Sequence, residues 1–134
     1  MGKSIASFKD LIVYQEAYRA SIDVMLEIVS KLPDSEKYDL KDQLRRSCKA
    51  ISRLIAEGYA KKHQRAGFRK YLDDALGESN EIIVSLNHAK DLYYKYVDIK
   101  LCDNLINRYD ILGKQIYRLA EAWVYFRRKP SPTS

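Results

Sequence analysis

Hydrophobic residues recur along most of this 134-residue chain at alternating steps of three and four, the spacing that places them on one face of an α-helix. The pattern predicts a first helix over residues 8–32. It should end before Pro33, because proline has no backbone N–H to donate and disfavours helical geometry in the residue before it. The predicted buried seam of this helix is Leu11, Tyr14, Tyr18, Ser21, Met25, Ile28 and Leu32.

Two further helices are predicted over residues 36–62 and 66–96. The first of these has small residues on its seam, which allow a neighbouring helix to approach closely; the seam is Leu40, Leu44, Ser47, Ile51, Leu54 and Gly58. The second keeps a seven-residue repeat without a slip through Phe68, Leu72, Ala75, Ser79, Ile82, Leu86, Ala89, Tyr93 and Tyr96.

A fourth helix is predicted over residues 98–128, with Asp98 as its N-cap and a frayed tail over residues 130–134. Its seam is Leu101, Leu105, Leu112, Ile116, Leu119, Trp123 and Phe126. Short links between amphipathic helices of similar length make neighbours antiparallel. The chain is therefore predicted to form one all-α domain over residues 1–134, an up-and-down four-helix bundle. The seven-residue period predicts a left-handed twist.

The composition, 46% hydrophobic and 31% charged with five glycines and three prolines, is typical of a globular helical protein. Cys48 and Cys102 lie within helical patterns and lack the spacing of metal ligands, so they are expected to be reduced core residues. No apolar run is long enough to span a bilayer, and the first residues lack the apolar core of a signal peptide. We therefore expect a cytoplasmic protein that makes no contact with a membrane.

Tyrosine is unusually frequent, with eleven tyrosines against three phenylalanines. So many phenol rings cannot all lie in one small core. Some are expected at a subunit interface or binding surface, where the ring buries area while the hydroxyl finds a partner. The alternative is that they border the core.

Positive charge is concentrated between Lys37 and Lys70, where eleven Lys and Arg residues face three acidic residues, a net charge of +8 against +6 for the whole chain. Four of these cations recur every four residues and are predicted to form one outward face that could contact the phosphates of RNA or DNA. They are Lys41, Arg45, Lys49 and Arg53, with Arg46 beside them and Lys61, Lys62, Arg65 and Arg69 extending the charge. The alternative is a solvated helix face with no ligand.

Acidic residues gather on the third predicted helix, where Asp74, Glu78 and Glu81 share a face and His88 follows. A di-iron bundle needs two Glu-x-x-His pairs, and the chain contains none. It also lacks a phosphate-binding glycine loop, a dinucleotide-binding turn and a nucleophile elbow. We therefore expect no catalytic site, no metal and no cofactor. The acidic residues are predicted to form salt bridges with the neighbouring basic helix.

Several short motifs resemble the four-helix-bundle family encoded in intervening sequences of bacterial 23S ribosomal RNA genes. The most specific are Gln43-Leu44-Arg45-Arg46, Ile51 and Ile55-Ala56-Glu57-Gly58; further matches are Phe8, Leu11, Ala17, Pro33, Glu36, Phe68, Leu72, Ala75, Gly77 and Glu81. The resemblance covers about residues 8 to 124. The chain departs from the family at Leu54, where Asn is usual, and at Glu78, where Ser is usual.

The resemblance implies a ring-shaped homopentamer with no known enzymatic activity. The chain is also similar to the accessory variability proteins of diversity-generating retroelements, basic pentameric bundles that associate with a reverse transcriptase and bind nucleic acid. Among the motif residues, a carboxylate of Glu57 or Glu81 is hypothesised to meet Arg46 inside the bundle and fix the register of the helices. The function expected is a non-enzymatic, oligomeric basic bundle that binds RNA or DNA. The alternative is a scaffold that docks a partner protein and does not contact nucleic acid.

Overall fold

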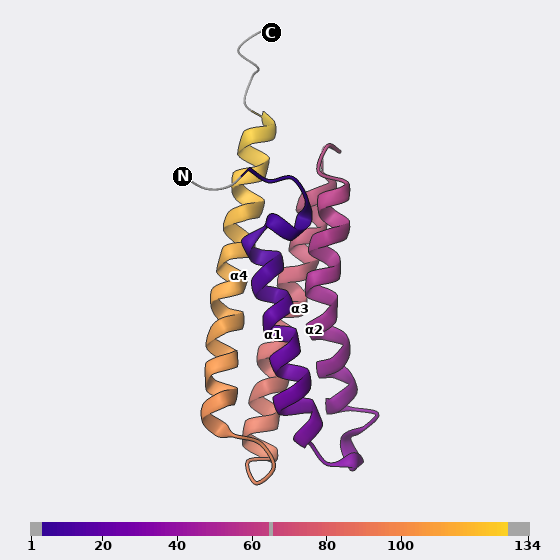
Figure 1. The fold of residues 1–134 in the computed structure, drawn as a ribbon, viewed down its shortest axis with the longest axis vertical. Helices are drawn as coiled ribbons and strands as arrows, with labels where there is room; N and C mark the ends of the chain where they lie inside the picture. Colours follow the sequence, from indigo (N-terminus) through magenta and orange to yellow (C-terminus); the bar gives the residue numbers. More distant parts are fainter. Residues whose placement is uncertain (1–3, 65, 129–134) are drawn as a thin grey trace.

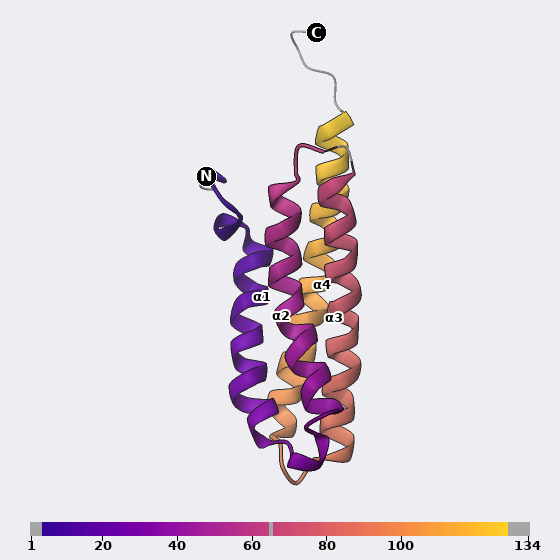
Figure 2. The ribbon, with the colours of Figure 1, turned by 90° about the vertical axis from the view of Figure 1, so that its right-hand side faces the viewer.

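Four long helices make up most of the protein in the computed structural model, which describes residues 4–64 and 66–128, with side chains up to residue 123. They are α1 (Ile12–Asp23), α2 (Leu40–Ala60), α3 (Gly67–Leu92) and α4 (Ile99–Arg128). The chain runs down α1, up α2, down α3 and up α4 (Figures 1 and 2). The predicted all-α, up-and-down bundle is confirmed. Its left-handed twist stays a prediction, and the predicted frayed tail lies outside the described residues.

Three helix ends differ from the prediction by more than two residues. A separate 3-10 turn, Phe8–Asp10, precedes α1, because Leu11 has an extended backbone. Helix α2 begins at Leu40 rather than residue 36, after a 3-10 turn at Asp34–Glu36. Helix α3 ends at Leu92 rather than residue 96. Its last turn is held by Tyr93, whose hydroxyl donates to Glu36 Oε2 at 2.6 Å. The predicted N-cap of α4 is confirmed, since Leu101 N donates to Asp98 Oδ1 at 3.2 Å.

The first helix contains one wide turn that shifts which sequence positions face the core. After Asp23 the helix continues as a π-helical turn, Val24–Ile28, and then a 3-10 turn, Val29–Lys31. A π-helical turn holds one extra residue, so the side chains before and after it are out of phase. The buried set before the turn is Val13, Ala17, Ala20, Ser21 and Val24, and after it Ile28, Val29 and Leu32. Of the predicted seam, Tyr18 is 51% exposed and Tyr14 and Met25 are half-buried; Leu11, Ser21, Ile28 and Leu32 are buried as predicted.

The core runs along the bundle axis and contains the predicted seam of α2, that of α3 up to Tyr93 and that of α4 up to Trp123. Its largest fully buried side chains are Tyr109, Phe68, Ile28, Leu44, Ile51, Ile55, Leu72, Ile82, Leu86, Leu105, Leu112 and Ile116. The predicted seam residue Tyr96 is 55% exposed, and the side chain of Phe126 lies outside the described residues. Tyr109 occupies the one position that the predicted α4 seam left empty. Ser79 Oγ donates to the Tyr109 carbonyl at 3.0 Å, which joins α3 to α4.

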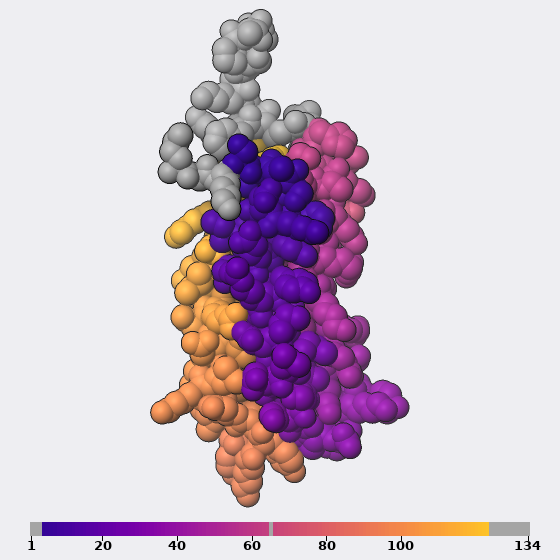
Figure 3. Space-filling view, viewed as in Figure 1, coloured from indigo at the N-terminus to yellow at the C-terminus, as the bar shows by residue number. Residues whose placement is uncertain are grey.

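Figure 3 shows α1 crossing the front of the bundle between α4 and α2. An ion pair fixes its α4 side, with Arg108 Nη1 2.6 Å from Asp23 Oδ2. At the end of the bundle where α2 meets α3, the indole of Trp123 in α4 donates to the Lys62 carbonyl at 3.3 Å. Both contacts join segments distant in the sequence, and the second places α4 beside the α2–α3 connection, residues 61–66.

Candidate nucleic-acid interface

Three of the predicted phosphate-binding cations, Arg46, Lys49 and Arg53, lie on the outer edge of α2, and we call them the basic face. Arg46 and Arg53 are exposed and pair only within their own helix, with Asp42 at 3.0 Å and Glu57 at 3.4 Å. Among the described residues, no carboxylate forms an ion pair with Lys49, which is also exposed. The basic face is therefore open to an anion from outside the chain.

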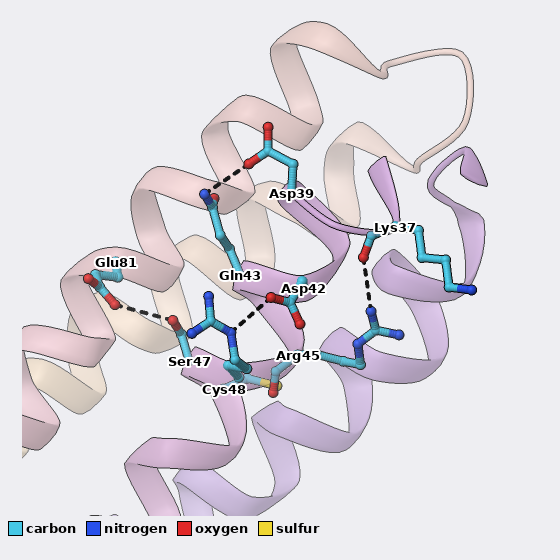
Figure 4. Close-up of polar contacts among 9 residues, drawn as sticks. Lys37, Asp39, Asp42, Gln43, Arg45, Ser47, Cys48 and Glu81 are labelled. Carbon is cyan, nitrogen blue, oxygen red and sulfur yellow. Dashed lines mark hydrogen bonds and ion pairs between the residues drawn. The ribbon is translucent and has the colours of Figure 1, made fainter. Parts of the chain in front are cut away.

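Lys41 and Arg45 do not belong to this face, which corrects the predicted outward stripe. The Lys41 side chain is only 14% exposed; its ammonium donates to the Leu32 carbonyl at 3.2 Å and lies 3.6 Å from Asp34 Oδ1. Arg45 is half-buried and donates to the Lys37 carbonyl at 3.3 Å (Figure 4). The reason is geometric: four residues turn a helix by about 400°, so three such steps rotate the stripe by about 120°.

A second group of cations lies at the end of α2 and the start of α3. We call Lys61, Lys62 and Lys70 the basic end. Among the described residues, no carboxylate forms an ion pair with any of them. The Lys61 ammonium instead donates to the Tyr71 hydroxyl at 2.9 Å, which raises the pKa of Lys61. The Lys62 ammonium lies over the Tyr59 ring, 4.1 Å from its centroid.

The two remaining predicted cations have different outcomes. Arg69 bridges two helices, because its Nη1 lies 2.8 Å from Glu121 Oε1 in α4 and its Nε lies 3.6 Å from Asp73 in α3. Its side chain is 33% exposed. Arg69 therefore serves packing of α3 on α4 in the first place. Arg65 lies outside the described residues.

A groove of about 930 Å³ separates the basic face from α3. We call it the α2–α3 groove. Its α2 wall is Gln43, Arg46, Ser47, Lys49, Ala50 and Arg53, and its α3 wall is Glu78, Asn80, Glu81, Val84, Ser85 and His88. Ser47, Ala50 and Ser85 are buried, so small side chains form the floor. Cations thus line one wall and carboxylates the other.

The carboxylates of the groove do not form the predicted salt bridges. Ser47 Oγ donates to Glu81 Oε2 at 3.2 Å (Figure 4). Burial raises the pKa of Glu78, and its hydrogen bond to Glu81 raises it further. The Arg53 charge acts in the opposite sense, but no ion pair joins Glu78 to α2 among the described residues.

The hypothesised internal pairing of Arg46 is wrong. Arg46 is exposed and binds Asp42, one turn earlier in the same helix. Glu57 pairs with Arg53, and Glu81 accepts from Ser47. These carboxylates lie at the surface, where exposed pairs have little effect on folding free energy.

The family-like motif residues have separate structural roles. The Gln43 side chain donates to Asp39 Oδ1 at 3.0 Å, at the start of α2 (Figure 4). Gly58 is buried where α3 crosses closest, because a Cβ there would lie 2.6 Å from the Tyr71 Cβ. Gly77 differs, since a Cβ there would meet nothing within 4 Å. Packing within the chain therefore requires the first glycine and leaves the second unexplained.

Potential metal ligands and thiols are two kinds of reactive side chain in the described part of the chain. Those residues contain no group of three or more His, Cys, Asp or Glu side chains placed to hold a metal ion. Both cysteines are buried in the core, as predicted, and burial raises the pKa of Cys48 and of Cys102 to about 11. Both thiols are therefore protonated near neutral pH and poor nucleophiles. None of the described helices has the length and hydrophobicity that a bilayer span requires.

The sequence pattern predicts some tyrosines at a binding surface but does not assign Tyr59 and Tyr71 to the basic end. These two are twelve residues apart, and the turn between α2 and α3 brings both beside lysines. The available signal was that the two tyrosines flank Lys61, Lys62 and Lys70 in the sequence.

The fold and the surface together define a small all-α bundle with a basic face, a basic end and a groove of mixed charge. The chain belongs to the 23S rRNA-intervening sequence protein family, whose profile matches residues 9–118. The family resemblance of the sequence motifs is thereby confirmed. No curated protein matches the chain.

Proposed function

We propose that this protein is a non-enzymatic bundle, acting in the bacterial cytoplasm, that binds RNA or DNA through phosphate contacts on the basic face and the basic end. One observation carries the proposal: Lys49, Lys61, Lys62 and Lys70 have no carboxylate partner among the described residues. Arg46 and Arg53 have only exposed partners one turn away. Exposed pairs of this kind contribute little free energy, so a phosphate can replace the carboxylate.

The two groups of cations lie along one element. From Arg46 to Lys62 the chain advances sixteen residues, almost all within α2, which is about 24 Å at 1.5 Å per residue. A nucleic-acid strand rises about 3.4 Å per base pair, so this length matches roughly seven base pairs. Contacts of this kind neutralise phosphates and release counterions without reading bases.

The test measures how binding depends on salt. The double variant Lys49→Gln/Arg53→Gln removes two exposed cations from the basic face. The control is Lys114→Gln in α4, because Lys114 is 67% exposed and pairs with Asp110 one turn away, much as Arg53 pairs with Glu57. Nuclease-treated protein is titrated with labelled RNA and DNA oligonucleotides. The slope of log affinity against log salt should fall by about 0.7–0.9 per cation removed, and only in the double variant. An unchanged slope would remove the proposal.

We also propose that the protein assembles into the homopentamer that the family resemblance implies. The α2–α3 groove supports this, because it combines one cationic and one acidic wall. Gly77, next in sequence to Glu78 of the acidic wall, adds a stretch of α3 where a Cβ would meet open space. Repetition of the basic surface would strengthen weak phosphate contacts through avidity. Native mass spectrometry tests the assembly; a monomer at micromolar concentration would contradict it.

The second candidate function is a scaffold that docks a partner protein, such as a reverse transcriptase. It is favoured by exposed apolar side chains on α1 and the π-helical turn that follows it, where Ile12 is 65% and Leu26 is 63% exposed. A complex with a protein that resists high salt, together with no binding of nucleic acid, would support this candidate against the first.

A further inference from the structure

Two tyrosine rings at the basic end each have a lysine ammonium close by. The Lys62 Nζ lies over the Tyr59 ring, 4.1 Å from its centroid. The Lys61 Nζ lies 5.1 Å from the centroid of Tyr71 and 2.9 Å from its hydroxyl, so it is at the hydroxyl edge of that ring. Tyr59 and Tyr71 are half-buried, so each ring keeps part of its surface open to solvent. Both contacts are weak enough for the ammonium groups to leave when phosphates are offered.

The inner sides of both rings are fixed by packing. Tyr71 lies against the backbone of α2 at Gly58. The Tyr59 and Phe68 rings are packed nearly at right angles with centroids 6.1 Å apart, and Phe68 packs in the same way on Trp123 with centroids 5.0 Å apart. The rings therefore form a rigid support, which binds a flat ligand at a low cost in side-chain entropy.

Charge distinguishes this end of the bundle from the other. Residues 59–71 contain five Lys and Arg residues and no Asp or Glu. At the opposite end, Tyr94 and Tyr96 are more exposed, at 56% and 55%, but residues 91–98 contain two aspartates and a single lysine. That end also has a lysine over an exposed tyrosine, Lys37 at 5.4 Å from the centroid of Tyr38, but residues 31–41 contain as many carboxylates as lysines. Exposed tyrosine therefore occurs at both ends, and the first end has the excess of positive charge beside it.

From this combination we infer that the basic end binds single-stranded nucleic acid, with unpaired bases stacked on Tyr59 and Tyr71. Every base has a π-face, so the stacking is independent of sequence. On binding, the Lys61 and Lys62 ammonium groups move from the rings to the phosphates on either side of the stacked bases. A duplex keeps its bases within the helix and makes only the phosphate contacts. The inference rests on the proposed function and adds to it the class of ligand, unpaired nucleotides.

The test compares two pairs of substitutions and two ligands. The double variant Tyr59→Leu/Tyr71→Leu removes the proposed stacking rings, and Tyr94→Leu/Tyr96→Leu is the control at the opposite end. The ligands are a single-stranded uridine oligonucleotide and a blunt duplex with the same number of phosphates. The first variant should lose at least about fivefold in affinity for the single strand and keep its affinity for the duplex. The control should bind both ligands as the unchanged protein does.

Two further measurements keep the test decisive if leucine disturbs the packing. Tyr71→Phe removes the hydrogen bond from Lys61 but keeps the ring, so it should retain single-strand affinity. Trp123 is the single tryptophan of the chain and touches Lys62 and Phe68, so its fluorescence reports on this end. Binding of the single strand should change that fluorescence more than binding of the duplex.

The outcomes separate the inference from the function on which it rests. Equal losses for single strand and duplex, or a loss in the Tyr94→Leu/Tyr96→Leu control, would overturn the stacking site and leave phosphate binding intact. Failure of the unchanged protein to bind either ligand would remove both.

Discussion

Gly58 of α2 and Tyr71 of α3 are so close that no side chain fits between them. A Cβ at position 58 would lie 2.6 Å from the Cβ of Tyr71 and 3.0 Å from Cδ1 of Phe68. The Tyr71 Cβ is fixed to its backbone, so relief requires the helices to move apart. We predict that Gly58→Ala lowers the free energy of unfolding by about 1–3 kcal/mol, as overpacking does in other cores. Urea unfolding followed by circular dichroism measures it, and stability equal to the unchanged protein would contradict it.

Gly77→Ala is the matched substitution with the opposite expected sign. No atom lies within 4 Å of the added methyl group, and alanine is favoured over glycine in a helix by about 0.5–1 kcal/mol. The subunit should therefore become more stable to urea. If another subunit packs against α3 at Gly77, beside the α2–α3 groove, the same methyl group should reduce the assembled mass, which sedimentation at several concentrations detects. A less stable subunit with an unchanged oligomer mass would contradict both expectations, because it would indicate that the methyl group meets an atom of its own chain.

Lys41 and Lys49, two turns apart on α2, should differ in what they contribute. Lys41→Ala removes a hydrogen bond to the Leu32 carbonyl and an ion pair to Asp34, so unfolding free energy should fall by about 1 kcal/mol. The salt slope of nucleic-acid binding should stay the same. Lys49→Ala should reduce that slope and leave stability within about 0.5 kcal/mol. The two variants therefore separate folding from binding. A reduced salt slope in Lys41→Ala together with an unchanged slope in Lys49→Ala would refute the placement of the basic face.

Stability should depend on pH through Glu78. Its pKa in the folded protein is raised above the ordinary value of 4.5, chiefly by burial, so the folded state holds this proton more tightly than the unfolded chain. The contribution of the protonated carboxyl is complete below pH 4.5 and is lost as pH rises through the raised pKa. Glu78→Gln should accordingly raise the melting temperature at neutral pH, with a gain that shrinks towards acid.

Asp74→Asn is the control for this experiment, since Asp74 lies one turn away on α3 and is exposed. Its melting temperature should follow that of the unchanged protein at each pH. A gain for Glu78→Gln that persisted undiminished in acid would show that the lost charge is not its cause.

The four helices were predictable because burial imposes a period that the sequence displays directly. The predicted α2 seam is buried or half-buried throughout, and the seams of α3 and α4 are so up to Tyr93 and Trp123, whereas Tyr96 is 55% exposed. The omission at Tyr109 also lies on the α4 seam. On the first helix, Tyr18 is exposed where the pattern predicts burial, because a period read along the sequence cannot reveal where a turn accommodates one residue more. The small residues of the α2 seam correctly indicated close approach, which Gly58 demonstrates.

The candidate site was predictable only in part. Net charge located the basic segment, but a four-residue spacing does not stay on one face of a helix, so Lys41 and Arg45 were assigned outward positions that they do not have. Pairing of lysines with Tyr59 and Tyr71 depends on the turn between two helices, which composition does not encode. The ion-pair partner of Arg46 was not predictable from the motif residues either, since Asp42 rather than Glu57 or Glu81 binds it.

The wide turn at Val24–Ile28 lets the first helix hold one residue more than a regular α-helix of the same length would. The buried positions before the turn, Val13, Ala17, Ala20 and Val24, are separated by steps of four, three and four, and the next step, to Ile28, is four where the alternation calls for three. Deleting one residue within the turn would therefore restore the alternation and keep both stretches on the core side. An aligned relative with a one-residue gap here would keep the same buried face with a regular helix in place of the wide turn.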